Sequence, residues 1–474
     1  MNTRRIITAS ALILIITVTV MCIISGIGTA SEPQETTAAP TEETLPSSDA
    51  RRIYADAAQA AASMTDQTVS CVIRQQMSVG DEAYCLDSNR IMRATAMDTD
   101  GLSVLVNETA AIGEHTVSCA EAFSDGTAYI AIDENQFFCE MSADDFWQRQ
   151  IPAVILDERQ YSQVTAAKNE GNTVITFSGA SSAERWAMPD NAQFISAEGT
   201  VTLDTSLLLT ESTYHICYQL GDVQIEKDVR VGLSSTVPDF TVPSRETAQP
   251  ISDPDAVRAL EYACGYLMQS TQINANITEA ILCEAYGDQR VQNTAIQMLA
   301  EGTNCTANVD IITTLTNSSK ADSATQKVQN IHYQDSQYTL TVNGGEPAHQ
   351  SGVTPLMMKT YCHDYFLSTM ILPQYISGAT VTDTGSTYRY DFTANDNFAH
   401  LLCQNASQIL YQDPALLLNL SDSYAVEAVN AYLIVDKVTG LPTASGISCI
   451  AIYSVEGFPY RLQYQTEQTY TIGS

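Results

Sequence analysis

The sequence predicts an α+β fold with two tandem units of antiparallel strands, each opened by a helix, behind an N-terminal transmembrane helix. Three observations support this prediction. One long uncharged apolar segment stands near the N-terminus, runs of β-branched and aromatic residues alternate with polar ones between turn signals, and one ordered set of landmarks occurs twice. A chain of 474 residues with 45% hydrophobic content is large enough to build more than one core.

The charge balance excludes whole classes of partner. The chain has 22 Lys and Arg against 55 Asp and Glu, for a net charge of −33. Binding to nucleic acid or to anionic lipid headgroups requires clustered Lys and Arg. We therefore expect no nucleic-acid partner, and an acidic body of a kind common outside the cell.

Residues 1–30 predict a membrane anchor or a signal peptide. Arg4 and Arg5 precede an uncharged stretch over residues 6–30, and about 20 apolar residues suffice to span a bilayer as a helix. Because the charges stand before the stretch, the positive-inside rule places the body outside. We favour an uncleaved anchor, which makes this a single-pass protein of the cell membrane. The alternative is cleavage after Ala30, which would make it a secreted protein.

Two polar segments divide the remainder of the chain. Residues 31–50 are rich in Pro, Thr, Glu and Ser and predict a disordered acidic stalk. Residues 234–254 are rich in Pro, Ser and Thr and predict a linker. The stretches 51–233 and 255–474 are then two domains of similar size.

The two predicted domains read as copies of each other. Each begins with an Ala-rich amphipathic stretch, at residues 56–64 and 255–263. Asp204 and Asp436 follow similar strands, which predicts that they occupy the same turn. Further landmarks recur in the same order: Gly80-Asp81 with Gly287-Asp288, Tyr161 with Tyr375, Phe177 with Phe392, and Cys217 with Cys449. Such an ordered series indicates a tandem duplication.

Within each copy the elements follow from local signals. Strands are predicted over residues 68–77, 102–106, 127–132 and 338–342. These runs are rich in β-branched and aromatic residues, and their hydrophobic residues recur at every second position. Hairpin turns are predicted at Asp100-Gly101, Asp125-Gly126 and Asn343-Gly344, because these residues tolerate positive φ. Short helices are predicted over residues 142–147, with Ser142 as N-cap, and over residues 356–369.

The most specific local signal is the turn from Val435 to Pro442, which reads Val-Asp-Lys-Val-Thr-Gly-Leu-Pro. With the order of elements, this turn resembles the lipoprotein-carrier superfamily, which covers the LolA-like periplasmic carriers and related mycobacterial lipoproteins. The resemblance implies two tandem half-barrels, each enclosing an apolar cavity under its opening helix. The first copy keeps Asp204 and Leu209 but lacks the Gly-Leu-Pro.

Cysteine spacing predicts no repeated disulfide framework. One of the 12 cysteines, Cys22, lies in the predicted anchor, so an odd number remains outside it. A two-residue turn at Gly80-Asp81 places Cys71 opposite Arg90 and Cys85 opposite Gln76, which excludes a direct bridge across that hairpin. We interpret most cysteines as small buried apolar residues.

Catalytic and metal-binding motifs are missing from the sequence. There is no nucleophile elbow, Walker loop, dinucleotide fingerprint or HExxH, and the six histidines show no ligand spacing. Cys362-His363-Asp364 is interpreted as part of a helix with His363 and Asp364 on its surface. The sequence therefore predicts a protein that is not an enzyme, with no catalytic residue, no metal and no cofactor.

Two main functional hypotheses follow. The first is a binding protein for a hydrophobic ligand, such as a lipid or acyl chain. The alternative is a cell-surface sensor or protein-interaction module without a small ligand, and an extracellular enzyme is third. For the first hypothesis we expect a cavity between the 255–268 helix and the strands of the second copy, with Arg258 and Glu261 facing outward. The candidate ligand-binding residues, which would equally suit a packed core, are Tyr388, Tyr390, Leu433, Leu260, Leu267, Tyr129 and Ile132.

Overall fold

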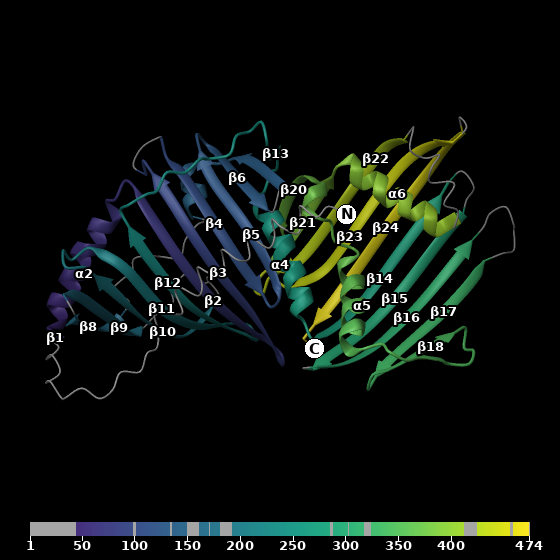
Figure 1. Ribbon diagram of the computed structural model, residues 1–474, viewed down its shortest axis with the longest axis horizontal. Coiled ribbons are helices and arrows are strands. Elements are labelled where there is room, and N and C mark those ends of the chain that lie inside the picture. The colour runs from purple at the N-terminus through teal and green to yellow at the C-terminus, as the bar shows by residue number, and fades with distance from the viewer. Residues whose placement is uncertain are drawn as a thin grey trace. The chain divides into compact units, whose positions relative to one another are not determined.

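Two large β-sheets and a few helices make up the described chain, which confirms the α+β class (Figure 1). The computed structural model describes residues 44–97, 101–132, 135–148, 161–169, 171–180, 192–284, 288–301, 303–316, 324–411, 424–455 and 458–473. The predicted anchor lies outside these residues, as do Asp100 and Gly287 of the predicted turns. Within the described residues, no helix combines the length and apolarity that crossing a bilayer requires.

The first sheet contains thirteen strands, all antiparallel except for the pairing of β13 with β7. Two helices accompany it, α2 (Ser47–Ala62) and α3 (Ala143–Gln148). In spatial order its strands are β1 (Thr44–Leu45), β8 (Tyr161–Asn169), β9 (Asn172–Ala180), β10 (Gln193–Leu203), β11 (Leu209–Leu220), β12 (Val223–Ser234), β2 (Gln67–Val79), β3 (Glu82–Thr95), β4 (Ser103–Ile112), β5 (His115–Ser124), β6 (Thr127–Ile132), β7 (Asn135–Glu140) and β13 (Gln249–Pro250).

The second sheet contains eleven strands, all antiparallel to their neighbours. Its helices are α4 (Asp255–Gln269), α5 (Pro355–Leu367), the short 3-10 helix η2 (Pro373–Tyr375) and α6 (Asp396–Tyr411). In spatial order its strands are β20 (Ile376–Asp383), β21 (Thr387–Ala394), β22 (Tyr424–Asp436), β23 (Pro442–Val455), β24 (Phe458–Ile472), β14 (Gln272–Cys283), β15 (Asp288–Glu301), β16 (Asn304–Thr316), β17 (Thr325–Gln334), β18 (Gln337–Val342) and β19 (Ala348–Gln350).

The tandem arrangement is confirmed by strand order. Without β1 and β13, the first sheet runs from β8 to β12 and then from β2 to β7, and the second runs from β20 to β24 and then from β14 to β19. Every strand of one copy thus has a counterpart in the other. Asp204 and Asp436 stand in the same turn, between β10 and β11 and between β22 and β23. In both turns the Asp carboxylate accepts backbone N–H bonds from the residues that follow it.

The predicted equivalence of Cys217 and Cys449 is wrong by one residue. Both lie on equivalent strands, β11 and β23. The strand before each of them, β10 or β22, contains a β-bulge at the equivalent position, which allows the two copies to be aligned. The first pair after the bulge is Ser196 with Cys217 in the first copy and Ala428 with Ile450 in the second. Cys217 therefore corresponds to Ile450. The reason is the turn after Asp436, which is one residue longer than the turn after Asp204.

Several local predictions are confirmed. The Gly80-Asp81 hairpin has the predicted register, with Cys71 opposite Arg90 and Cys85 opposite Gln76. The other turns and caps agree as well: Asp125 and Gly126 have φ of 50° and 71°, Asn343 and Gly344 have 50° and 67°, and Ser142 caps α3 by accepting the Asp145 N–H.

Both polar segments are more structured than expected. Within the predicted stalk, Thr44 and Leu45 pair with β8, and α2 already begins at Ser47. The helix starts early because Ala50 and Tyr54 are fully buried against the first sheet. Within the predicted linker, residues 249–250 pair with β7.

Candidate functional site

Helix α4 opens the second copy, yet it contacts both sheets (Figure 1). Leu260 and Leu267 pack into the core of the second sheet, whereas Tyr266 packs into the core of the first. The helix also approaches the first sheet closely at Gly265, where an added Cβ would lie 3.0 Å from Ile112 Cβ. The helix predicted to cover the second sheet therefore covers the first as well.

The outward position predicted for Arg258 and Glu261 is wrong. The Arg258 side chain is only 16% exposed and forms ion pairs with Glu121 and, at 3.7 Å, with Glu108. Glu261 Oε2 lies 3.4 Å from His115 Nε2. The polar face of the helix is buried because strands β4 and β5 of the first sheet lie against it.

Arg258 belongs to a buried ion cluster, which we define as Arg90, Glu108, Glu121 and Arg258. Arg90 lies 3.3 Å from Glu108. Although burial raises the pKa of Glu108, the two guanidinium groups and hydrogen bonds to its carboxylate lower it below its ordinary value overall. Buried charges are stable only when they are paired in this way.

Beside the cluster lies a cavity of about 130 Å³, which we call the inner cavity. Nine of its lining residues come from strands of the first sheet, and Tyr262 comes from α4. Glu108 is one of the lining residues, and its Oε1 atom accepts hydrogen bonds from Ser88 Oγ at 2.7 Å and from Tyr262 Oη at 3.3 Å. The full lining is Ile73, Gln75, Leu86, Ser88, Glu108, Tyr214, Ile216, Lys227, Val229 and Tyr262.

Lys227 is the cation that lines the inner cavity. It lies on β12 between Ile216 of β11 and Gln75 of β2, and its ammonium group is 5.6 Å from the centre of the Tyr218 ring. Burial lowers the pKa of Lys227 below its ordinary value, because the charged form is poorly solvated there.

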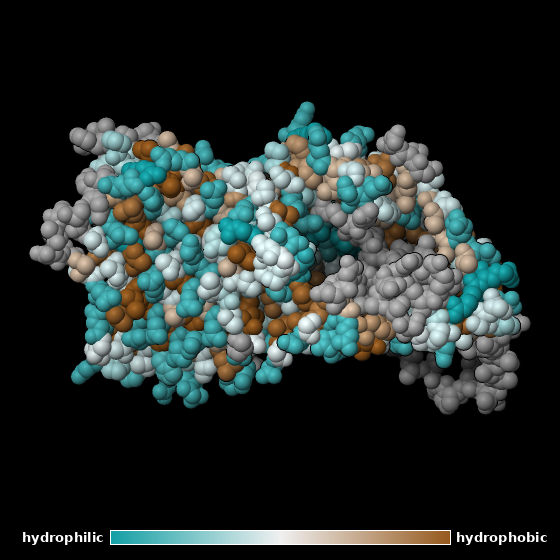
Figure 2. All heavy atoms as spheres, turned by 180° about the vertical axis from the view of Figure 1, so that it is seen from behind, coloured by the Kyte–Doolittle hydropathy of each residue, from teal (hydrophilic) through white to brown (hydrophobic). Residues whose placement is uncertain are grey.

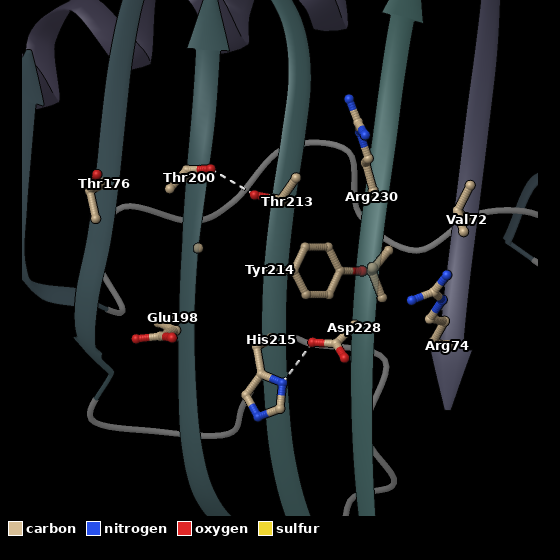
Figure 3. A pocket seen from close by; sticks show the side chains of 12 residues that line it. Val72, Arg74, Thr176, Glu198, Thr200, Thr213, Tyr214, His215, Asp228 and Arg230 are labelled. Carbon is tan, nitrogen blue, oxygen red and sulfur yellow. Dashed lines mark hydrogen bonds and ion pairs between the residues drawn. The ribbon is translucent and has the colours of Figure 1, made fainter. Parts of the chain in front are cut away.

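A groove of about 640 Å³, which we call the outer groove, lies on the opposite face of the first sheet (Figure 3). Figure 3 shows Thr200 bonded to Thr213 and His215 bonded to Asp228, at 2.6 and 2.8 Å. Most residues of the outer groove carry polar or charged side chains, and the full lining is Val72, Arg74, Thr176, Glu198, Gly199, Thr200, Thr213, Tyr214, His215, Asp228, Val229 and Arg230. A third hollow of about 390 Å³ lies between residues 237–242 and the ends of β3, β4 and β5.

The predicted ligand-binding residues are mostly core. Leu260, Leu267, Tyr390, Leu433 and Ile132 belong to one buried hydrophobic cluster. The other two differ in exposure: Tyr388 is half-buried against this cluster, and Tyr129 is 8% exposed with its ring 6.5 Å from Phe138. None of the seven lines the inner cavity, the outer groove or the third hollow.

Sequence reasoning missed the polar residues of the inner cavity, although a signal was present. Glu108 stands among Val104, Val106 and Ala110 at the inward positions of a period-two strand. Lys227 likewise stands between Ile225 and Val229. A charged residue at a position that alternation assigns to the core indicates a polar site there.

The remaining candidates from the sequence are Cys362, His363 and Asp364, which lie on α5. His363 is buried rather than on the helix surface as predicted, and burial lowers its pKa to about 4, while Asp364 is exposed. Among the residues that the structure describes, no group of three or more His, Cys, Asp and Glu side chains is arranged to hold a metal ion.

Comparison with known proteins finds likeness in structure alone. No family model and no curated protein matches the chain. The crystal structure of LprF from Mycobacterium bovis matches with 8% identity and a TM-score of 0.23, over 47% of this chain and 94% of LprF. A putative AttH from Nitrosomonas europaea matches with 8% identity and a TM-score of 0.14, over 85% of this chain and 92% of that one. OccK5 from Pseudomonas aeruginosa covers 86% of this chain and 99% of its own, with 6% identity and a TM-score of 0.10. Likeness at this level says nothing about ligand or activity.

Proposed function

We propose that this chain is an extracytoplasmic, membrane-attached binding protein that holds a small, mainly apolar ligand in the inner cavity and catalyses no reaction. The observation that carries the proposal is the cavity itself. It lies on the face of the first sheet that α4 covers, and it is lined by residues of both copies. The location outside the membrane rests on Arg4, Arg5 and residues 6–30 of the sequence.

The lining suits such a ligand. Ile73, Leu86, Ile216 and Val229 provide apolar walls, and a few polar groups converge beside them. Apolar walls with a few placed polar groups are the usual construction of small-molecule sites. A dry apolar cavity of about 150 Å³ binds benzene in another protein. The 130 Å³ present here therefore accommodates a short chain or one end of a longer one.

Filling the two hollows separately tests where the ligand binds. Ile216→Phe fills the inner cavity, and Val72→Phe fills the outer groove, because each residue lines only one of them. We expect the full chain in phosphatidylcholine nanodiscs to bind octanol, with binding lost in Ile216→Phe and kept in Val72→Phe. Thermal unfolding of both variants controls for overpacking, which typically costs about 1–3 kcal/mol. The reverse pattern, or no binding by the unaltered chain, contradicts the proposal.

The outer groove favours a second candidate, which is binding of a polar ligand or partner protein to the open face of the first sheet. Its charges are largely paired within the protein, since Arg230 lies 2.7 Å from Glu211 and Arg74 lies 3.8 Å from Asp87. Because these charges are compensated within the protein, we place this candidate second. On the part of the molecule that grey atoms leave visible in Figure 2, apolar and hydrophilic residues are interspersed.

A further inference from the structure

We propose that the inner cavity selects ligands that carry an acid group, and that Lys227 is the counter-ion for that group. This inference rests on the proposed function and names the class of ligand: an aliphatic chain ending in a carboxylate. The chain would contact the apolar walls at Ile73, Leu86 and Ile216, and the carboxylate would accept hydrogen bonds from the Lys227 ammonium group.

The charges around the cavity leave Lys227 uncompensated. In the buried ion cluster, Arg90 and Arg258 balance Glu108 and Glu121. Among the described residues, no carboxylate forms an ion pair with Lys227, and its ammonium group lies over the Tyr218 ring. A half-buried cation without a counter-ion is unusual in a chain with a net charge of −33.

The strand residues beside Lys227 are uncharged. Ile216 and Gln75 flank it on the neighbouring strands. Glu108 also lines the cavity, but its carboxylate accepts bonds from Ser88 and Tyr262 and lies beside two guanidinium groups, which compensate its negative charge. Burial disfavours the charged form of Lys227 and so lowers its pKa, and a bound carboxylate would stabilise that charged form.

The second copy lacks this arrangement. Strand pairing places Tyr464 of β24 at the position of Lys227. The cation nearby is Arg290, which is paired with Glu279 on the adjacent strand. One copy therefore has a spare positive charge beside a cavity, and the other has an aromatic ring and an internal ion pair.

Comparing octanoate with octanol tests the inference, since the two differ only in the head group. Calorimetric titration of the full chain in phosphatidylcholine nanodiscs should show octanoate binding more tightly than octanol. Lys227→Met should weaken octanoate binding by about tenfold or more, the effect of losing one charge-assisted hydrogen bond, and should change octanol binding far less. The matched control is Lys327→Met, which removes an exposed strand lysine and should leave both affinities unchanged.

Other outcomes separate the two proposals. Equal binding of octanoate and octanol to the unaltered chain would overturn the role of Lys227 and leave the proposed function standing. Loss of both ligands in Lys227→Met would show a structural role for this lysine and overturn the inference. If acetate bound as tightly as octanoate, the site would be a simple anion site, and the inference that the ligand carries an aliphatic chain would be overturned. Binding of neither amphiphile would overturn the proposed function itself.

A separate observation in the second copy points to a covalent cross-link. Cys403 of α6 and Cys449 of β23 are fully buried, with their sulfur atoms 3.5 Å apart. We infer that these two thiols form a disulfide when the chain matures in an oxidising compartment. The thiols lose two protons and two electrons, the S–S bond forms, and a disulfide-bearing oxidant is reduced to its dithiol by exchange.

Mass spectrometry of the full chain tests the cross-link. Protein exported from the cell should be lighter by two hydrogen atoms than protein made in a reducing cytoplasm, and should take up two fewer alkylating groups after denaturation. Cys403→Ser should abolish the difference, whereas Cys283→Ser, which removes another buried cysteine, should keep it. Complete alkylation of every cysteine in the exported protein would overturn the inference.

Discussion

Tyr262 of α4 donates a hydrogen bond to Glu108 of β4 at 3.3 Å, across the boundary between the two copies. The helix belongs to the second copy in sequence, but its hydroxyl and guanidinium groups satisfy carboxylates of the first sheet. A second link joins the copies where Glu82 Oε1 accepts a hydrogen bond from the Thr271 N–H at 2.8 Å. The second copy therefore contributes Tyr262 to the lining of the inner cavity of the first sheet.

Removal of Arg258 should destabilise the protein strongly. Arg258→Met removes a positive charge that pairs with the buried carboxylates of Glu108 and Glu121. Breaking a buried ion pair typically lowers the free energy of unfolding by about 3–5 kcal/mol. Arg230→Met is the control, since its partner Glu211 is at the surface and exposed pairs contribute about 1 kcal/mol or less. Urea unfolding measures both free energies. Equal losses would show that the cluster has no special role.

Stability should fall in acid through Glu108. Its folded-state pKa is depressed below the ordinary value, so its contribution is present above that value and is lost as the pH falls through the folded pKa. Glu108→Gln should therefore have a flatter dependence of the unfolding free energy on pH in acid than the unaltered protein. Denaturant titrations at a series of acidic pH values measure this. An unchanged slope would assign the acid sensitivity to other groups.

Octanoate affinity should fall at alkaline pH. The pKa of Lys227 in the free protein lies below its ordinary value of 10.5, so the ammonium form is lost before the pH reaches that value, and affinity for the acid declines with it. Lys227→Arg should bind octanoate with little pH dependence over the same range, because arginine stays charged. Titrations at increasing pH measure both. A parallel decline in the two proteins would exclude Lys227 as the titrating group.

Cleavage between the copies should not separate them. A protease site inserted near residue 241 would cut the described segment that joins β12 to α4. The fragments should still elute together in gel filtration, because α4 is packed on β4 and β5 and its ion pairs remain. The control is the same digestion of Arg258→Met, where we expect partial dissociation. Separate elution of the fragments from the unaltered sequence would contradict this interface.

The sequence by itself determined the features that depend on neighbouring residues. Turn chemistry at Gly80-Asp81 and Asn343-Gly344 specified hairpins and, for the first, its register. The repeated order of landmarks predicted two α+β units of the same plan, because a duplicated sequence repeats its local preferences, and the two sheets have matching strand orders. Helix α6 was not predicted, although its sequence has a helical period.

Only the tertiary structure decided which surfaces meet. The periodicity of α4 separates an apolar face from a polar one, but it does not reveal that the polar face covers carboxylates of another sheet, so Arg258 was expected in solvent. Strand alternation places Lys227 inward, yet whether a cavity remains beside it depends on how far side chains from five strands and a helix fill the space. Tyr390 and Leu433, which were predicted to line a cavity, are instead packed in the core of the second sheet. Whether a space is filled depends on the combined volumes of side chains that are distant in sequence, and a local sequence pattern does not specify which side chains meet.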